Sequence, residues 1–337
     1  MKRRIALVTG GFSGEAVISY KSAKNIETQI DKDKFDVYTI DICKEGWLYV
    51  SEDGSRQEVD KNDFSIVVNG QKLHFDAALM CIHGSPGEDG KLPGYFDLIG
   101  LPYTSCDAAI GAITFNKRFT IALAAINGIT VAGSVLVIKD NGYQLDKIKH
   151  LRFPVFIKPN NGGSSVATSK VVSYDEEKLK AAINKAFEAD KQVLVEEFIK
   201  GRELTVGVYK LHGETVVLPM SEVILKPKSE EEYFDFEAKY SGKTEEITPA
   251  LVDDEIKEKI NKAAEILYDA LNCKGIVRID FIYDTEKKLP YMLEINTVPG
   301  QTDASFIPQQ INAAGKSLTS VYTGFLEEAI ASGKIKL

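Results

Sequence analysis

Two apolar segments near the C-terminal end constrain the fold most, because their alternation favours a single way of pairing. Residues 277–281 read VRIDF, residues 292–296 read MLEIN, and a polar stretch at 284–288 joins them. Strand residues two apart share a face, so Arg278 lies beside Asp280, and Glu294 lies beside Asn296. The residues predicted on the opposite face, toward a core, are Ile279, Phe281, Leu293 and Ile295. A hairpin centred on residue 287 makes Asp280 and Glu294 near cross-strand neighbours.

Two opposed carboxylates on one strand face repel each other unless a positive charge lies between them. One interpretation is a solvated strand face on which Arg278 neutralises both acids. The other is a divalent cation, because Asn296 adds a neutral oxygen to the two carboxylates. Magnesium prefers a few protein oxygens and takes its other ligands from water and substrate phosphates. The pattern therefore predicts a Mg²⁺-nucleotide site at Asp280, Glu294 and Asn296.

A lysine at the end of another apolar strand is the second unusual feature. Residues 153–159 read FPVFIKP, which places Lys158 at the strand end, and the loop 160–165 reads NNGGSS. A fixed lysine can hold phosphate charge, and the amides of a glycine-bearing loop can approach phosphates closely. The loop lacks the pattern GxxxxGK[ST], which excludes the Walker class. Taken alone, this loop is more typical of a plain hairpin turn, and the acidic run 193–203 is more typical of an exposed edge.

The chain divides into three regions by its pattern of strands and helices. Its 337 residues suffice for two or three compact units. Residues 1–115 alternate apolar strands with helical segments, which predicts a parallel α/β unit with turns at 9–14 and 83–87 near its ligand-binding edge. Residues 116–197 are typical of a small α+β unit. Residues 198–337 form the third region, and its long charged segment 226–249 is predicted to be a lid.

Charge and cysteine content exclude several classes of protein. Forty-one Lys and Arg against forty-nine Asp and Glu give a net charge of −8, so no global positive field favours nucleic acid or an anionic membrane. Four scattered cysteines without a CxxC pair argue against a zinc or disulfide framework and indicate a reducing cytoplasm. The start has too few apolar residues for a signal peptide. The uncharged run 119–138 is split by Asn127 and Gly128, which predicts a helix, a turn and a strand.

Seven groups of residues, in one order along the chain, resemble the D-alanine-D-alanine ligases of the ATP-grasp superfamily. They are GGFSGE at 10–15 with Ser19, HG at 83–84 with GEDG at 87–90, GLPYT at 100–104, KP at 158–159 with GSSV at 163–166, EAKY at 237–240, RID at 278–280 and EINTVPG at 294–300. The resemblance implies a three-domain ATP-grasp fold of α/β and α+β parts. Its N-terminal α/β domain would be followed by a central subdomain at 116–197 and a C-terminal subdomain at 198–337.

The resemblance also implies ligands for ATP and magnesium. Lys117 and Lys158 would hold phosphates, and Lys239 would reach the phosphate that is transferred. Glu196 and Glu203 would meet the adenine side and the ribose. Asp280, Glu294 and Asn296 would bind two Mg²⁺ ions, for which Mn²⁺ could substitute.

The same resemblance assigns residues to the amino-acid substrates. Glu15 would hold the ammonium group of the first D-alanine and connect through Ser164 to Tyr240 on the lid. His83 would lie near the carboxylate of this first substrate, although a lone histidine after a strand is by default a packed residue. Arg278 and the Gly300 amide would stabilise the oxyanion, and Ser305 would bind the carboxylate of the second substrate.

The implied activity is the ATP-dependent joining of two D-alanine molecules through an acyl phosphate, for peptidoglycan precursors, by a cytoplasmic homodimer that binds neither nucleic acid nor membrane. One alternative is a ligase of the same family that joins D-alanine to D-lactate or D-serine. Tyr240 favours an amine substrate, because relatives that make the lactate product carry histidine there. The other alternative is a nucleotide-binding regulator that has lost catalysis, against which the intact set Arg278, Asp280, Glu294 and Asn296 argues.

Overall fold

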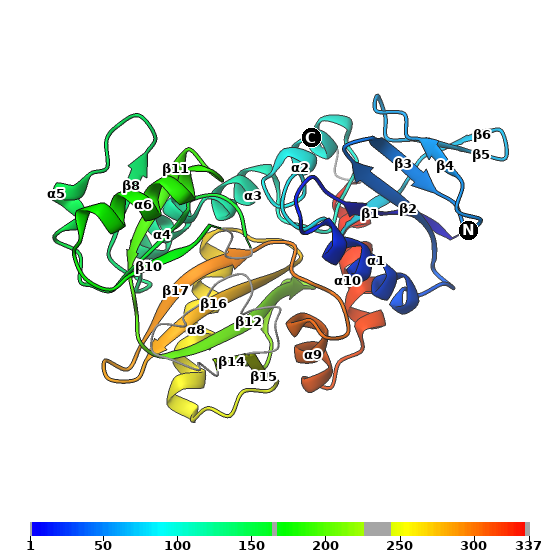
Figure 1. Cartoon of the computed structure of the whole chain (residues 1–337). Helices are drawn as coiled ribbons and strands as arrows, with labels where there is room; N and C mark the ends of the chain where they lie inside the picture. The colour runs from blue at the N-terminus through cyan, green and yellow to red at the C-terminus, as the bar shows by residue number, and fades with distance from the viewer. Residues whose placement is uncertain (1, 164–166, 226–243, 334–337) are drawn as a thin grey trace.

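Three sheets of four or more strands organise the molecule (Figure 1). The computed structural model describes residues 2–163, 167–225 and 244–333. Within these ranges the N-terminal, central and C-terminal parts of the chain each build one of the three sheets, and a small two-stranded sheet, β5 (Ile66–Val68) with β6 (Gln71–Leu73), accompanies the first. The fold is thus mixed α/β, as the sequence predicts. None of the described helices has both the length and the apolar composition needed to span a membrane.

The N-terminal sheet has the order β4-β3-β2-β1-β7. Its strands are β1 (Arg3–Gly10), β2 (Phe35–Cys43), β3 (Gly46–Val50), β4 (Arg56–Glu58) and β7 (Ala77–Met80). The prediction of parallel pairing is confirmed for β2, β1 and β7, and α1 (Ala16–Gln29) forms the crossover between β1 and β2. It is wrong for β3 and β4, which pair antiparallel. Cys43 pairs with Gly46, and a connection of two residues is too short for a parallel crossover.

The central sheet is antiparallel, in the order β10-β9-β11-β8. Its strands are β8 (Ser134–Ile138), β9 (Val155–Pro159), β10 (Ser169–Val171) and β11 (Gln192–Glu197). One side is covered by α6 (Glu176–Phe187), whose Leu179 and Ile183 are buried against the sheet. The helix begins after the cap Asp175, whose carboxylate accepts hydrogen bonds from two backbone N–H groups. The short helix α5 (Leu145–Ile148) lies between β8 and β9 in the chain.

The C-terminal sheet is also antiparallel, in the order β15-β14-β12-β16-β17, with β13 paired to β12. Its strands are β12 (Arg202–Leu211), β13 (Glu214–Val217), β14 (Ser221–Leu225), β15 (Thr244–Ile247), β16 (Ile276–Asp284) and β17 (Leu289–Asn296). The amphipathic helix α8 (Asp254–Ala270) packs its apolar side on β12, β16 and β17. The sequence pattern did not predict the helices α2 (Lys91–Ile99), α3 (Ala108–Phe115) and α9 (Phe306–Ala313).

The hairpin of β16 and β17 has the predicted register where it matters for chemistry. Asp280 pairs with Glu294. A β-bulge after Asp280 then shifts the register, so that Phe281 pairs with Met292. The prediction that Leu293 faces the core is therefore wrong: Met292 takes that place at 1% exposure, and Leu293 lines a cavity.

The last helix ties the N-terminal and C-terminal sheets together. α10 (Leu318–Ser332) begins after the cap Ser317 and contributes Phe325 and Leu326 to one buried cluster. Leu7 of β1 and Tyr209 of β12 belong to the same cluster. The helix α4 (Lys117–Ile126) similarly packs on β17, with Ile121 and Ala124 in the core of the C-terminal sheet. The turns after β1 and β7 are thereby fixed beside the end of β17. The domain limits at 115/116 and 197/198 stay predictions.

Candidate active site

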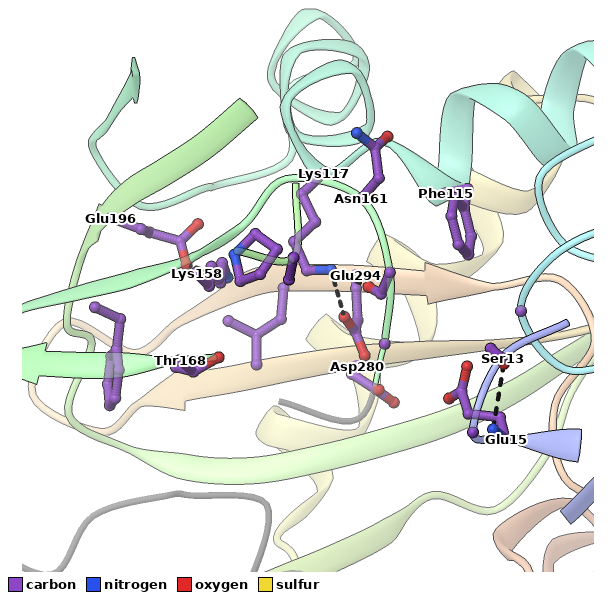
Figure 2. A pocket seen from close by; sticks show the side chains of 18 of the residues that line it. Ser13, Glu15, Phe115, Lys117, Lys158, Asn161, Thr168, Glu196, Asp280 and Glu294 are labelled. Atoms are coloured by element: carbon purple, nitrogen blue, oxygen red, sulfur yellow. Dashed lines mark hydrogen bonds and ion pairs between the residues drawn. The ribbon is translucent and has the colours of Figure 1, made fainter. Parts of the chain in front are cut away.

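A cavity of about 720 Å³ lies between the central and C-terminal sheets (Figure 2). Seven of the predicted site residues line it: Glu15, Lys117, Lys158, Glu196, Glu203, Asp280 and Glu294. They come from the start of α1, from α4, and from strands of both sheets. The cavity is therefore shared by all three parts of the chain.

Part of the wall is apolar, which suits a planar base. Phe156, Phe198 and Ile199 contribute from the central sheet and the segment that follows it, and Ile282 and Leu293 contribute from the hairpin. The rings of Phe156 and Phe198 lie 5.7 Å apart with planes inclined at 62°. The bulge that turns Leu293 out of the core thus supplies one side of this slot.

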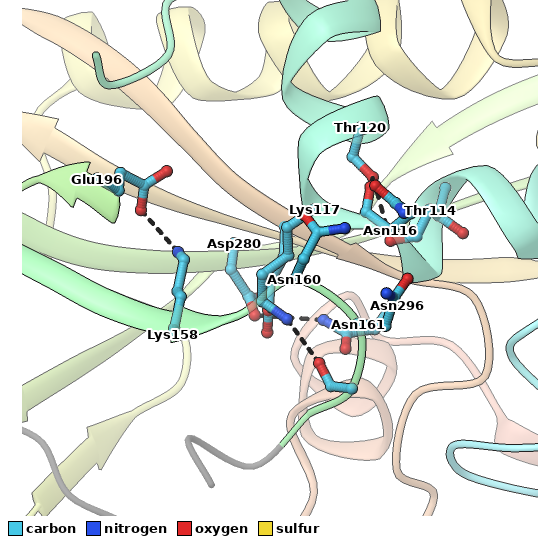
Figure 3. Close-up of polar contacts among 12 residues, drawn as sticks. Thr114, Asn116, Lys117, Thr120, Lys158, Asn160, Asn161, Glu196, Asp280 and Asn296 are labelled. Atoms are coloured by element: carbon cyan, nitrogen blue, oxygen red, sulfur yellow. Dashed lines mark hydrogen bonds and ion pairs between the residues drawn. The ribbon is translucent and has the colours of Figure 1, made fainter. Parts of the chain in front are cut away.

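Two lysines hold positive charge inside the cavity. Nζ of Lys158 on β9 lies 2.6 Å from Oε2 of Glu196 on the adjacent strand β11 (Figure 3). Lys117 donates from Nζ to the carbonyl of Gly162 at 2.5 Å and lies 3.9 Å from Oε2 of Glu294. Burial lowers the pKa of Lys117, and the nearby Glu294 opposes this shift. Both cations are therefore held by acceptors that a phosphate could replace.

The glycine loop after β9 is fixed at its start by α4. The carbonyl of Asn160 accepts from the backbone N–H of Lys117 at 3.0 Å, and its Oδ1 accepts from the backbone N–H of Arg118 at 2.9 Å. Asn161 donates from its backbone N–H and its Nδ2 to Oδ2 of Asp190, at 2.7 and 2.8 Å. The loop does join two antiparallel strands, as a plain hairpin turn would, and it also lines the cavity at Gly162 and Gly163.

The predicted metal ligands lie on the two paired strands of the hairpin. Arg278 donates to Asp280 through Nε at 2.9 Å and through Nη2 at 2.8 Å. Nδ2 of Asn296 lies 3.3 Å from Oδ2 of Asp280. Arg278 thus neutralises Asp280 but not Glu294, whose carboxylate lies near Lys117. The interpretation in which Arg278 neutralises both acids is thus correct for one acid only, and the divalent-cation site stays a prediction.

The charge around the site fits an accompanying cation. Among the residues that the structure describes, four cationic side chains line this cavity and the one beside it: Lys21, Lys117, Lys158 and Arg278. Eight carboxyl groups line the same cavities: Glu15, Glu88, Glu196, Glu197, Glu203, Glu246, Asp280 and Glu294. A polyphosphate would be repelled here unless divalent ions came with it. No group of three or more His, Cys, Asp or Glu side chains suited to a metal occurs in the described parts of the chain. The two hairpin carboxylates and Asn296 are therefore a partial set of hard oxygens that phosphates would complete.

A second cavity of about 270 Å³ adjoins the first, since Glu15, Lys117 and Glu294 line both. Five more of the predicted site residues line this second cavity: His83, Arg278, Asn296, Gly300 and Ser305. Ser305 precedes α9, and its Oγ accepts from the backbone N–H of Thr302 at 3.1 Å. The volume of this second cavity suits small substrates.

Three predicted site residues, Ser164, Lys239 and Tyr240, lie outside the described residues. The same holds for most of the predicted lid at 226–249. Its final part is described, and Thr244–Ile247 forms β15, paired with β14. This end of the segment belongs to the C-terminal sheet.

His83 is buried and neutral. Its Nδ1 donates to the carbonyl of Val298 at 2.6 Å, and its Nε2 lies 3.2 Å from Oγ of Ser22. A carbonyl can only accept, so the proton is on Nδ1 and Nε2 accepts from the hydroxyl. Burial lowers the pKa of His83 to about 4. The histidine therefore serves the cavity as a packed hydrogen-bonding group without charge.

Glu88 is a cavity residue to which the sequence assigns no role. It is partly buried, and its carboxyl oxygens accept from the backbone N–H groups of Gly84 at 2.7 Å and Val298 at 3.2 Å. Burial first, and then the charge of Glu15, raise its pKa to about 8. The motif GEDG contains this residue, but sequence alone does not show that its carboxyl group is buried.

This raised pKa predicts how stability depends on pH. Between pH 6.5 and 8 the folded protein keeps a proton on Glu88 that the unfolded chain has lost, so the free energy of unfolding falls as the pH rises. The slope is at most about 1.4 kcal/mol per pH unit. Urea unfolding across this range measures it, and Glu88→Gln should remove the Glu88 contribution. An identical slope in wild type and Glu88→Gln would contradict the prediction, whatever the absolute stability of the variant.

Two antiparallel sheets that enclose a cavity, with lysines on one side and acidic strand residues on the other, define an ATP-grasp enzyme. Residues 4–106 match the family D-ala D-ala ligase N-terminus, and residues 117–327 match D-ala D-ala ligase C-terminus. The D-alanine–D-alanine ligase of Parabacteroides distasonis is 43% identical over 337 residues, with all of both chains covered. The chain therefore belongs to the D-alanine–D-alanine ligase family.

Solved structures agree with this assignment. D-alanyl-alanine synthetase A from Vibrio cholerae is 29% identical with a TM-score of 0.87, over 98% of this chain and 99% of that one. The D-alanine–D-alanine ligase of Bacillus anthracis complexed with ATP is 26% identical with a TM-score of 0.76, over 98% and 99% of the two chains. The chain thus has the fold of relatives of which one holds ATP.

Proposed function

We propose that this chain is an ADP-forming ligase that joins two D-alanine molecules into D-alanyl-D-alanine for peptidoglycan precursors. The observation that carries the proposal is the shared wall of the two cavities. Glu15, Lys117 and Glu294 line both, so a nucleotide in the larger cavity would direct its phosphates at a small substrate in the other. Phosphoryl transfer from ATP to a substrate carboxylate would give an acyl phosphate, which the amine of the second substrate can attack.

The nucleotide would lie with its base against the apolar slot. Glu196 and Glu203 would meet the adenine side and the ribose, and Lys117 and Lys158 would turn from their present acceptors to the phosphates. Lys239 would join them at the transferred phosphate. Asp280, Glu294 and Asn296 would hold two Mg²⁺ ions, or Mn²⁺ in their place. When bound, such ions would screen the phosphate charge that the acidic cavity otherwise repels.

The small substrates would be held by groups around the second cavity. Glu15 would hold the ammonium group of the first D-alanine and connect through Ser164 to Tyr240. His83, being neutral, would pack beside the carboxylate of this substrate without forming an ion pair with it. Ser305 would bind the carboxylate of the second D-alanine.

Arg278 and the Gly300 amide would stabilise the oxyanion formed when the amine attacks. One preorganised donor of this kind contributes about 3 to 4 kcal/mol to the transition state. Arg278 now donates to Asp280 through Nε and Nη2, so turning these two nitrogens to the oxyanion would exchange Asp280 for the substrate. We further propose that the enzyme works in the cytoplasm as a homodimer.

An assay of ADP release with several second substrates tests the proposal. We expect ATP turnover and the dipeptide product with D-alanine, and neither with L-alanine. Competing D-lactate should not enter the product, since Tyr240 favours an amine substrate. A depsipeptide or a D-serine product would favour the sister ligases instead. Nucleotide binding without ADP release would show a regulator that has lost catalysis.

A further inference from the structure

One row of paired residues crosses the C-terminal sheet beneath the proposed metal site. Ser221 of β14 pairs with Thr205 of β12, Thr205 pairs with Asp280 of β16, and Asp280 pairs with Glu294 of β17. Directly paired residues present their side chains on the same face. The row therefore places a threonine hydroxyl beside the carboxylate that is proposed to hold a divalent ion.

The hydroxyl of Thr205 donates to Oδ1 of Asp280. Thr205 is 3% exposed, and a β-branched side chain in a strand has few rotamers, so this donor is fixed in direction. Arg278 donates to both oxygens of the same carboxylate, and Asn296 donates to Oδ2. Two donors from the described residues reach each oxygen, which uses the acceptor capacity of a carboxylate. An ion can bind Asp280 only where one of these donors leaves.

Buried contacts hold Thr205 in place, whereas the competing donors line the second cavity. Nε2 of Gln310, which is fully buried on α9, donates to the carbonyl of Thr205 and to Oγ of Ser221, each at 3.0 Å. Oε1 of Gln310 accepts from the backbone N–H of Gly207 at 2.8 Å. Arg278 and Asn296 can turn toward ligands in the cavity. Thr205 is thus the donor that stays, and Oδ2 is the oxygen that becomes available.

We propose that Thr205 is a positioning residue that keeps Asp280 directed toward the divalent ion once Arg278 turns to the substrate. The inference rests on the proposed function, since it assumes that the ion binds there. Without the hydroxyl, Asp280 would be oriented only by Arg278 and Asn296, whose donors occupy the oxygens that the ion needs. Residues that orient a metal ligand in this way typically contribute 10- to 100-fold to metal affinity.

Binding of Mn²⁺ in the presence of a non-hydrolysable ATP analogue tests this inference without turnover. The signal of free Mn²⁺ in electron paramagnetic resonance gives the dissociation constant for wild type, Thr205→Val and Thr205→Ser. Valine keeps the shape of threonine and removes the donor, so we expect Mn²⁺ binding to weaken about 10-fold or more. Serine keeps the donor and should restore wild-type affinity. Loss of affinity in valine alone would support a role of the hydroxyl rather than of packing.

Thr215→Val is the matched control. Thr215 lies on β13 of the same sheet and lines neither cavity, and its hydroxyl also donates to a carboxylate, that of Asp269 on α8, at 3.0 Å. It should bind Mn²⁺ like wild type. A folded Thr205→Val with wild-type affinity would overturn the inference, as would equal weakening in Thr205→Ser. Thr205→Ala replaces valine if thermal melting shows that the valine variant is unfolded. Failure of the wild type itself to take up Mn²⁺ with the nucleotide analogue would instead overturn the proposed function.

Discussion

Replacing Arg278 with methionine is expected to lower kcat by about 10²- to 10³-fold, which is the usual cost of removing one donor to an oxyanion. Methionine keeps an apolar stem of similar length, so packing beside Phe306, whose ring centre lies 5.9 Å from the guanidinium carbon, is retained. The interaction is made with the transition state, so KM for ATP should change little. Steady-state ADP release at saturating D-alanine measures the effect.

Arg202→Met is the control for this variant. Arg202 also binds a carboxylate with two hydrogen bonds, to Glu222 at 2.7 Å each, and it lies in the same sheet without lining either cavity. Its loss should leave kcat near the wild-type value. Equal losses in both variants would indicate a general disturbance of the sheet, and full activity of Arg278→Met would contradict its role at the oxyanion.

Strand alternation predicts the chemical centre of the molecule well, because period-two patterning fixes which side chains share a face. The pairing of Asp280 with Glu294 follows from it directly. The error at Leu293 has a definite cause: Leu293 is itself the extra residue of a bulge, opposite the step from Asp280 to Phe281, and nothing in the local sequence marks it. Periodicity therefore predicts this face up to the bulge and fails beyond it.

Residues that act through burial were not predictable in the same way. Burial and then the charge of Glu15 raise the pKa of Glu88, and the turn that holds it contacts Val298, more than two hundred residues later in the chain. Gln310 is isolated in the sequence, and its three partners come from β12 and β14. Such contacts depend on how α9 and α10 return to the sheets, and no helix was predicted for residues 306–313. A method based on local pattern has no access to them.

The cations of the site share one arrangement that bears on catalysis. Lys158 is held by Glu196, Arg278 by Asp280, and Lys117 lies near Glu294. Each pair keeps a buried positive charge compensated until a ligand replaces the carboxylate. These three acids are thus expected to stabilise the cations before ligands bind. All three acids are also proposed ligands for the nucleotide or its metal. Nucleotide binding then exchanges partners rather than burying new charge.

The pair of Arg278 and Asp280 makes this exchange measurable as stability. Asp280→Asn leaves Arg278 without its counter-charge, and the two side chains are only 20% and 12% exposed. The free energy of unfolding of the metal-free protein should fall by about 3 kcal/mol, the lower end of the range for breaking a buried ion pair. Urea unfolding measures the loss. The exposed pair Lys34 and Glu327 provides the control, since Glu327→Gln should cost no more than about 1 kcal/mol.

The double variant Arg278→Met with Asp280→Asn completes the cycle. With both charges removed, the double variant should lose less stability than the sum of the two single losses, by about 0.5 to 3 kcal/mol of coupling. Methionine and asparagine leave no uncompensated charge in the second cavity, which is why the losses should not add. Strictly additive losses would show that the two side chains do not stabilise each other in the folded protein. The arginine would then need no exchange of partners to reach the substrate.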